Sequence, residues 1–197
     1  MAQDLTELLN FWFTQVSPER WFREDDDELQ AQVRGEVGSF YDQAVAGELK
    51  TWARTPEGML GLLLLLGEWP RRLFRGTPQA YATDDEALEL ARAGILAHLD
   101  DRIDRMFKMF FYRPFGHAEN IGDQRLSVFY VRERTKEPAW IDAAQQRLEL
   151  IERFGRFPYR NAILGRESTP DELAWLKENP TGLPLPTSSL TSSSAGI

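Results

Sequence analysis

Apolar side chains recur three or four positions apart through most of this chain, which is the spacing of one buried helix face. No run alternates between apolar and polar residues for more than a few positions, so the pattern predicts no β-strand. Short connections between successive helices favour antiparallel neighbours. The sequence therefore predicts an all-α, antiparallel array of about nine helices that forms a single domain over residues 1–178.

Start and end signals place the individual helices. A threonine followed three residues later by a glutamate, as in Thr83–Glu86 and Thr169–Glu172, is typical of a capping box, in which the two side chains satisfy free N–H groups. Thr55 before Pro56 predicts a further start, and Gly47 is expected to end a helix in the left-handed conformation. The predicted helical ranges are 5–13, 25–46, 55–69, 101–112, 118–134 and 138–154, with others opened by caps at Ser17, Thr83 and Thr169, the last ending near Lys177.

Net charge and cysteine content exclude several classes of function. The 197-residue chain has a net charge of −8, and nucleic-acid binding needs a basic face, so no nucleic-acid partner is expected. It contains no cysteine, which rules out disulfides, thiolate zinc sites and cysteine nucleophiles. The N-terminus lacks the pattern of a signal peptide, and the most apolar run, Met59–Leu66, is too short to span a membrane. We therefore expect a soluble cytoplasmic protein with no membrane partner.

The composition changes sharply at residue 179. From there to the end the chain is rich in proline, serine and threonine and carries no charged side chain. Because such a segment cannot bury enough apolar surface to fold, residues 179–197 are expected to form a disordered tail.

Seven large aromatic residues recur at helical spacing in the first third of the chain. They are Phe11, Trp12, Phe13, Trp21, Phe22, Trp52 and Trp69. Aromatic side chains at such spacing most often form the core, and this is our prediction. The alternative is that they line a groove for a partner peptide, as helical arrays often provide.

Two groups of arginines stand out in this acidic chain. The first follows the central helix, and the second lies in residues 151–172 among three aromatic side chains; together they comprise Arg71, Arg72, Arg75, Arg153, Arg156 and Arg160. Guanidinium groups bind carboxylates and phosphates in a planar fork, so a cluster of them favours an anion site. The alternative is a structural network, in which the arginines pair with Glu68, Glu119, Asp123 or Glu152 and brace the helices.

The segment His117–Gln124 combines a histidine, two carboxylates and an amide near a helix start. These side chains belong to His117, Glu119, Asp123 and Gln124. Three interpretations stay open: capping and pairing to arginine, a polar contact with a ligand, or acid–base catalysis. No metal site is predicted, because hard ions need more oxygen ligands than this segment supplies.

Several blocks of this sequence occur in the same order in a known family. They include Phe11-Trp12-Phe13, Trp69-Pro70-Arg71, Phe111-Tyr112-Arg113-Pro114, His117-x-Glu119, Asp123-Gln124 and Arg153-Phe154-Gly155-Arg156-Phe157-Pro158. Over roughly residues 5–176 the chain resembles the bacterial family known as domain of unknown function 924. The resemblance implies an all-helical, tetratricopeptide-like fold and no particular activity. The chain departs from the usual family residues at Gly67, Glu68, Ala118, Gln146 and Tyr159.

These observations lead to one functional hypothesis and two alternatives. We predict a helical binding protein with an arginine-rich pocket for a small or peptide-borne anion, between the helix ending at Trp69 and residues 153–161. The predicted site residues are Glu68, Trp69, Arg71, His117, Glu119, Asp123, Gln124, Arg153, Arg156, Arg160 and Asn161. The alternatives are a hydrolase that uses His117 with Glu119 or Asp123 as acid and base, and a protein–protein scaffold without a small-molecule site. No cofactor or metal is predicted, and the sequence does not indicate an oligomeric state.

Overall fold

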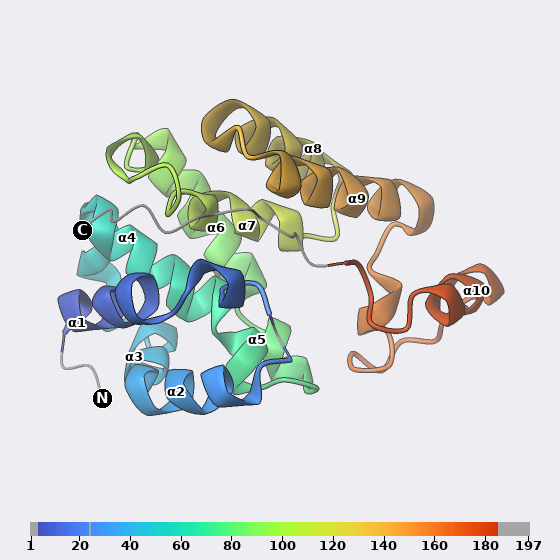
Figure 1. Cartoon of the computed structure of the whole chain (residues 1–197), viewed down its shortest axis with the longest axis horizontal. Coiled ribbons are helices and arrows are strands. Elements are labelled where there is room, and N and C mark those ends of the chain that lie inside the picture. Colours follow the sequence, from blue (N-terminus) through green and yellow to red (C-terminus); the bar gives the residue numbers. More distant parts are fainter. Residues whose placement is uncertain (1–3, 24, 185–197) are drawn as a thin grey trace.

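The computed structural model describes residues 4–23 and 25–184, and every regular element in these ranges is a helix (Figure 1). The predicted all-α class is therefore confirmed. The α-helices are α1 (Leu5–Asn10), α2 (Asp27–Val37), α3 (Phe40–Val45), α4 (Pro56–Leu63), α5 (Pro70–Leu73), α6 (Asp84–Leu96), α7 (Met109–His117), α8 (Ile121–Tyr130), α9 (Pro138–Phe154) and α10 (Pro170–Glu178). Short 3₁₀ and π-helical turns connect them: η1 (Phe11–Gln15), η2 (Pro18–Arg20), η3 (Lys50–Arg54), η4 (Leu64–Glu68), η5 (Pro78–Tyr81), η6 (Asp100–Arg102), η7 (Val131–Thr135) and η8 (Pro158–Arg160).

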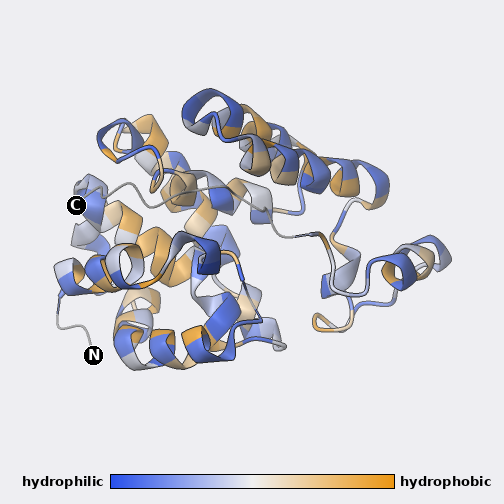
Figure 2. Cartoon of the chain, in the orientation of Figure 1, coloured by the Kyte–Doolittle hydropathy of each residue, from blue (hydrophilic) through white to orange (hydrophobic). Residues whose placement is uncertain are grey.

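Helix α4 lies at the centre of the main body and packs against α1, α6 and α7. After Glu57 in its first turn its residues are apolar on all sides, as expected for a helix surrounded by others, and Figure 2 shows the hydrophobic colouring of this part. Trp12, Trp21, Trp69 and Trp140 are fully buried in the core of the main body, and the rings of Trp12 and Trp69 meet edge to face at 5.5 Å. The predicted core role of the aromatic residues is confirmed for Phe11, Trp12, Trp21, Phe22 and Trp69, and Phe13 and Trp52 are partly buried against the same core.

Two helix predictions agree closely with the structure. Helix α9 coincides with the predicted range 138–154. At α10 both halves of the capping box are present, with the Thr169 hydroxyl accepting from the N–H of Glu172 and the Glu172 carboxylate accepting from the N–H of Thr169. The Thr55 hydroxyl likewise accepts from the N–H of Gly58 at 3.1 Å. Local capping chemistry was sufficient to place these helices.

The single helix predicted over residues 25–46 is wrong. The chain forms α2 and α3 instead, separated at Gly38, whose φ of 47° and ψ of −125° lie outside the helical region. Glycine adopts such a conformation without the steric cost that a Cβ atom would impose. The continuous apolar pattern across Gly38 concealed the break, because both short helices bury their apolar faces in the same core.

The helix predicted over residues 101–112 is also displaced. The chain forms the turn η6 first, and α7 begins only at Met109 and continues through Pro114 to His117. A proline has no N–H for the carbonyl four residues earlier, yet Pro114 lies within α7. The part of α7 beyond the predicted end at residue 112 carries Arg113 and His117.

The capping box predicted at Thr83 does not form. Its hydroxyl donates to the carbonyl of Leu66 at 2.6 Å rather than capping α6. In a regular helix that carbonyl would accept from the N–H of residue 70, which is Pro70 and has none. Pro70 was expected to end the central helix, but the chain continues through η4 directly into α5.

In the remaining predicted range, 118–134, the helix begins at Ile121, three residues later than predicted. The Asn120 side chain caps the first turn of α8 by accepting from the N–H groups of Gly122 and Asp123, at 2.8 and 3.2 Å. Residues 118–120 are therefore an extended approach to the helix, and the helical path then continues through η7 to Thr135.

The C-terminal part of the described chain projects from the main body (Figure 1). It has its own small apolar cluster, in which Leu150, Ile151 and Phe157 pack with Tyr159 and Trp175 among others. Of the tail predicted from residue 179, residues 185–197 lie outside the described part. The part that is described, residues 179–184, follows α10 and contributes Leu183 to this cluster. None of the helices described has the length and hydrophobicity that crossing a membrane requires.

Candidate functional site

One small cavity is lined by residues from α5, η5, α7, α9 and η8. These lining residues come from a stretch of ninety residues in the sequence. Its volume is about 60 Å³. The lining consists of Arg71, Tyr81, Arg113, His117, Arg147, Tyr159 and Arg160. Among the described residues the cavity is therefore lined by four guanidinium groups, an imidazole and two phenols, and by no carboxylate.

The lining divides into a buried floor and a more accessible rim. The floor consists of Arg71, Arg113, His117 and Arg160, none of which is more than 7% exposed. The rim consists of Tyr81, Arg147 and Tyr159, which are half-buried. Arginine is rarely buried without a partner, so the buried floor arginines need neighbouring groups that stabilise their charges.

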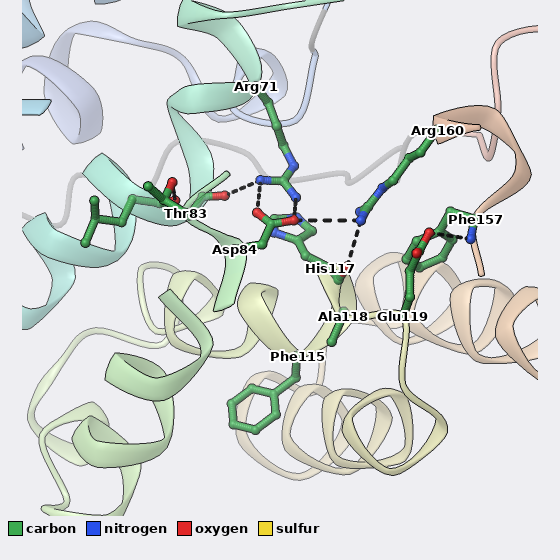
Figure 3. Close-up of polar contacts among 12 residues, drawn as sticks. Arg71, Thr83, Asp84, Phe115, His117, Ala118, Glu119, Phe157 and Arg160 are labelled. Carbon is green, nitrogen blue, oxygen red and sulfur yellow. Dashed lines mark hydrogen bonds and ion pairs between the residues drawn. The ribbon is translucent and has the colours of Figure 1, made fainter. Parts of the chain in front are cut away.

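Carboxylates behind the cavity hold two of the floor arginines in place. Arg71 donates from both terminal nitrogens to Asp84, at 2.8 and 2.9 Å, and also to the carbonyl of Gly67 at 2.7 Å (Figure 3). Arg113 donates from Nε and Nη2 to the two carboxylate oxygens of Glu68. Bidentate pairs of this kind fix the plane of a guanidinium as well as its position.

Glu68 is itself buried and serves more than one arginine. Arg72 donates to its Oε1 at 3.1 Å from the next helical turn. Burial alone would raise the pKa of Glu68, but the charges of Arg113, Arg72 and Arg71 together hold that pKa below its ordinary value. The carboxylate is therefore ionised inside the protein, where arginines outnumber it.

Arg160 is held differently, because no carboxylate pairs with it bidentately. Its Nη1 donates to the backbone carbonyl of His117 at 3.0 Å and lies 3.7 Å from the carboxylate of Asp84 (Figure 3). Its guanidinium lies over the rings of Tyr81 and Phe157, at 4.8 and 4.5 Å from their centroids. Aromatic faces stabilise a cation without consuming its hydrogen-bond donors.

Several donors on the cavity floor have no protein acceptor. Nε of Arg160 is buried and unpartnered in the part of the chain that is described. Over the same residues, neither Nη2 of Arg160 nor Nη1 of Arg113 donates a hydrogen bond to protein. Buried polar groups normally find a partner in the protein, in water or in a ligand. Nη2 of Arg160 and Nη1 of Arg113 therefore retain capacity for an acceptor from outside the chain, whereas Nε of Arg160 is enclosed by protein atoms.

His117 is a neutral imidazole surrounded by cations. Burial lowers its pKa well below the ordinary value of 6.5, and the nearby charges of Arg71, Arg113, Arg160 and Arg147 lower it further. Its Nδ1 is buried with no hydrogen-bond partner among the described residues. A neutral imidazole offers one donor and one acceptor to whatever fills the cavity.

The last turn of α7 explains why Arg113 and His117 meet. They are four residues apart and so share one face of the helix. The end of α7 is stabilised by the amide of Gln124, which reaches back from α8 at 2.7–3.3 Å. Its acceptors are the carbonyls of Phe115, Gly116 and Ala118. Carbonyls at a helix end lack intrahelical donors, so Gln124 positions the site without lining it.

Both carboxylates in the segment 117–124 are engaged elsewhere. Glu119 forms a bidentate pair with Arg166, and Asp123 pairs with Arg92. Neither carboxylate hydrogen-bonds to the His117 ring in the described structure. The cavity does not bring these three groups together in the manner that acid–base catalysis requires.

Two of the arginines predicted in residues 153–161 also lie away from the cavity lining. Arg156 donates from Nε and Nη2 to Glu172 at 2.7 and 2.8 Å, and Asn161 donates to the same carboxylate at 3.3 Å. Arg153 is exposed and lies over the ring of Phe154, 4.6 Å from its centroid. The contacts of Arg156 and Asn161 join the segments on either side of η8 to α10, the contact of Arg153 stays within α9, and none of them forms part of the cavity.

The other predicted residues have structural contacts. Trp69 is in the core, Glu68 and Arg72 form the buried pair described above, and Arg75 pairs with a carboxylate at the start of α2. Glu152 lies 3.6 Å from an arginine of α8. Of the predicted site, the cavity lining contains Arg71, His117 and Arg160.

Four lining residues were not predicted: Tyr81, Arg113, Arg147 and Tyr159. Arg113 was missed because α7 was expected to end before it. Arg147 carried a usable signal, since it stands four residues after Ala143 and four before Ile151, both of them buried. A cation on a buried helix stripe is unusual and indicates a polar site or a partner. No group of three or more potential metal ligands occurs in the residues described.

Comparison with known proteins places the chain in a family. It is similar to a solved structure, the protein of unknown function ATU0120 from Agrobacterium tumefaciens, with 34% identity and a TM-score of 0.83. The match covers 88% of this chain and 97% of that one. No curated protein matches the chain significantly. Residues 8–180 match the family described as "Bacterial protein of unknown function (DUF924)", and the chain therefore belongs to this family.

Proposed function

We propose that this protein binds a small anion, free or carried by a peptide, in the cavity between α5, α7, α9 and η8. The proposal rests on the excess of positive charge on the cavity floor. Three buried guanidinium groups and a neutral imidazole face a hollow of about 60 Å³ that no carboxylate lines. Nitrogens of Arg113 and Arg160 retain donors for an external acceptor.

The electrostatics of the floor support this proposal. Arg71 and Arg113 are fixed from behind by carboxylates, so the side that faces the cavity needs no rearrangement before an anion enters. Preorganised donors lose little entropy on binding. Because the floor is buried, the attraction between its cations and an anion is screened less than at the surface.

The two alternative functions have less support. A hydrolase with His117 as base would need a carboxylate near the ring, and both candidates pair with other arginines. A protein–protein scaffold would need a continuous exposed apolar face. The large exposed apolar side chains are distributed over four helices and comprise Val45, Leu96, Ile121, Phe129 and Leu173.

The direct test is calorimetric titration of the full chain with inorganic phosphate, sulfate and acetate at constant ionic strength. At least one anion should bind with one-to-one stoichiometry. At a concentration of about 100 times its Kd, it should add roughly 2.7 kcal/mol to the free energy of unfolding. Absence of measurable heat and of stabilisation for all three, relative to chloride, would contradict the proposal.

Two arginines from one segment provide a matched pair of variants. Arg160→Gln removes a floor cation and should weaken binding at least tenfold, whereas Arg156→Gln removes a cation paired with Glu172 and should leave Kd unchanged. If Arg160→Gln does not fold, Arg147→Gln on the half-buried rim replaces it, with an expected loss of several-fold. Equal effects of Arg156→Gln and of the lining variants would show that the cavity is not the site.

A further inference from the structure

We infer that the cavity selects a tetrahedral oxyanion dianion, either phosphate or sulfate or the terminal group of a small ester, over a carboxylate. This inference rests on the proposed function and specifies the class of ligand. Four features of the floor carry it: the size of the cavity, the balance of charge, the arrangement of the remaining donors, and the imidazole.

The size of the cavity limits the ligand to a compact head group. A buried water needs roughly 10–15 Å³ of space by the same measure, so about 60 Å³ accommodates a few waters or one group the size of phosphate. Sites for whole metabolites are several times larger. Any larger part of the ligand would therefore extend past the half-buried rim into solvent.

The balance of charge favours a ligand with two negative charges. The carboxylates of Glu68 and Asp84 contact four buried arginines, of which three line the cavity floor. Arg147 adds a further lining cation. The Coulomb energy between the floor and a ligand scales with ligand charge, so a dianion gains about twice the attraction of a monoanion in the same position.

The remaining donors suit a tetrahedral acceptor better than a planar one. A carboxylate is bound best by the two parallel N–H groups of one guanidinium fork. On Arg71 and Arg113, forks of this kind already hold Asp84 and Glu68. What remains is Nη1 on Arg113 and the Nε–Nη2 side of Arg160, where Nε is enclosed by protein atoms and cannot complete a fork, so the accessible donors come from two guanidinium groups on α7 and η8. Oxygens that point in several directions can accept from such separate donors at once.

His117 adds a contact that does not depend on charge. Its neutral ring lines the floor, and a ring nitrogen that reaches the cavity can donate to one oxyanion oxygen or accept from a protonated one. A protonated imidazole would be strongly disfavoured beside four guanidiniums in the empty site. The floor therefore supplies strong positive charge together with one adaptable hydrogen-bonding group.

The test compares affinities for inorganic phosphate, sulfate, glycerol 3-phosphate, acetate and malonate by calorimetry on the full chain at constant ionic strength. Phosphate or sulfate should bind at least tenfold more tightly than acetate. Malonate separates charge from shape, because it is a dianion built from two carboxylates, and it should bind more weakly than sulfate. Glycerol 3-phosphate binding more tightly than free phosphate identifies an ester as the ligand, and the reverse identifies the free ion.

The outcomes distinguish this inference from the proposed function. Acetate or malonate binding as tightly as phosphate and sulfate, with the loss in Arg160→Gln still present, would overturn the selectivity and leave an anion site. Failure of every anion to bind would overturn both. The conservative variant Arg113→Lys gives a second measure. A lysine keeps the charge but cannot pair bidentately with Glu68, so tetrahedral anions should lose affinity at least several-fold while Arg156→Lys shows no change.

Discussion

Arg156 and Arg160 are four residues apart in sequence, yet their surroundings differ in kind. Arg156 is paired bidentately with Glu172, and the nearby Arg166 is paired in the same way with Glu119. Arg160 has no bidentate carboxylate partner and rests between aromatic rings on the cavity floor. In the first setting each cation has its own anion, and in the second the cations outnumber the anions.

The difference separates what an arginine does for folding from what it can do for binding. A matched pair joins two segments and leaves no charge for a ligand, as the contact between Arg156 and Glu172 of α10 illustrates. An excess of buried cations costs stability, because each charge is removed from water without full compensation. Such an arrangement is most readily understood where a ligand supplies the missing negative charge. The comparison can be tested by replacing the carboxylates Glu68 and Glu172, and by measuring how the contribution of His117 to stability depends on pH.

The largest effect is expected at Glu68, the buried carboxylate behind the cavity. Glu68→Gln removes the negative charge between Arg72 and Arg113 while keeping the size of the side chain. Because both arginines are buried, we expect the free energy of unfolding to fall by about 3–5 kcal/mol, measured by urea denaturation.

The matched control is Glu89→Gln, which removes an exposed carboxylate 3.6 Å from Arg92 and should change stability by less than about 1 kcal/mol. A loss at Glu68 no larger than that at Glu89 would mean that the floor arginines do not depend on their buried carboxylate. The proposed excess of positive charge would then lack its structural basis.

A smaller effect is expected at Glu172, in the region of matched pairs. Its hydrogen bonds with Arg156 lower its pKa to about 2, with further contributions from the N–H of Thr169 and from Asn161. A lowered pKa in the folded state contributes stability that is complete above the ordinary value of 4.5 and is lost as pH falls toward 2.

Glu172→Gln should therefore lower stability by about 1–2 kcal/mol at pH 7 and by much less near pH 2. Urea denaturation of both proteins between pH 2 and 7 measures this difference. Anion affinity at pH 7 should stay unchanged, because the pair does not line the cavity. A parallel offset between the two proteins at every pH would show that the Glu172 charge is not the stabilising feature.

The helices were predictable wherever local chemistry determines them. Thr55, Thr169 and the apolar stripe of α9 mark real starts or ranges because capping and periodicity act within a few residues. Predictions failed at Gly38 and Thr83, where the tertiary structure decides. Gly38 permits a break that the apolar pattern does not show, and Thr83 satisfies a carbonyl seventeen residues earlier.

The candidate site was harder to predict, because it depends on partners distant in sequence. Nothing local distinguishes Arg160 from Arg156, since their partners belong to α7 and α10. Arg113 was missed because the predicted helix ends at residue 112, whereas α7 continues to His117. Arg147 could have been found from its position on the buried stripe of α9. The composition indicated an arginine-rich site in this part of the chain. The fold determines which arginines line the cavity and which are paired with carboxylates.

The smallest effect is expected in the pH dependence of stability caused by His117. It tests whether the positive charges of the floor arginines lower the pKa of this histidine. Because burial and Arg71, Arg113, Arg160 and Arg147 lower the pKa of His117, the unfolded chain takes up a proton below about pH 6.5 that the folded chain does not. Stability should therefore fall with decreasing pH by up to about 1.4 kcal/mol per pH unit, and His117→Gln should remove this slope. Urea denaturation at pH 7.5 and 5.5 measures it.

The chain offers an internal control, since its other histidine, His98, is exposed and lies 3.0 Å from the carboxylate of Asp101. His98→Gln should retain the wild-type slope. Saturating sulfate, whose charge is constant over this pH range, should reduce the slope of the wild type, because a bound dianion offsets the four guanidiniums that keep the imidazole neutral. Sodium chloride at equal ionic strength should not. An unchanged slope in sulfate would mean that the anion binds away from His117, and the contrast between Arg160 and Arg156 would then concern stability alone.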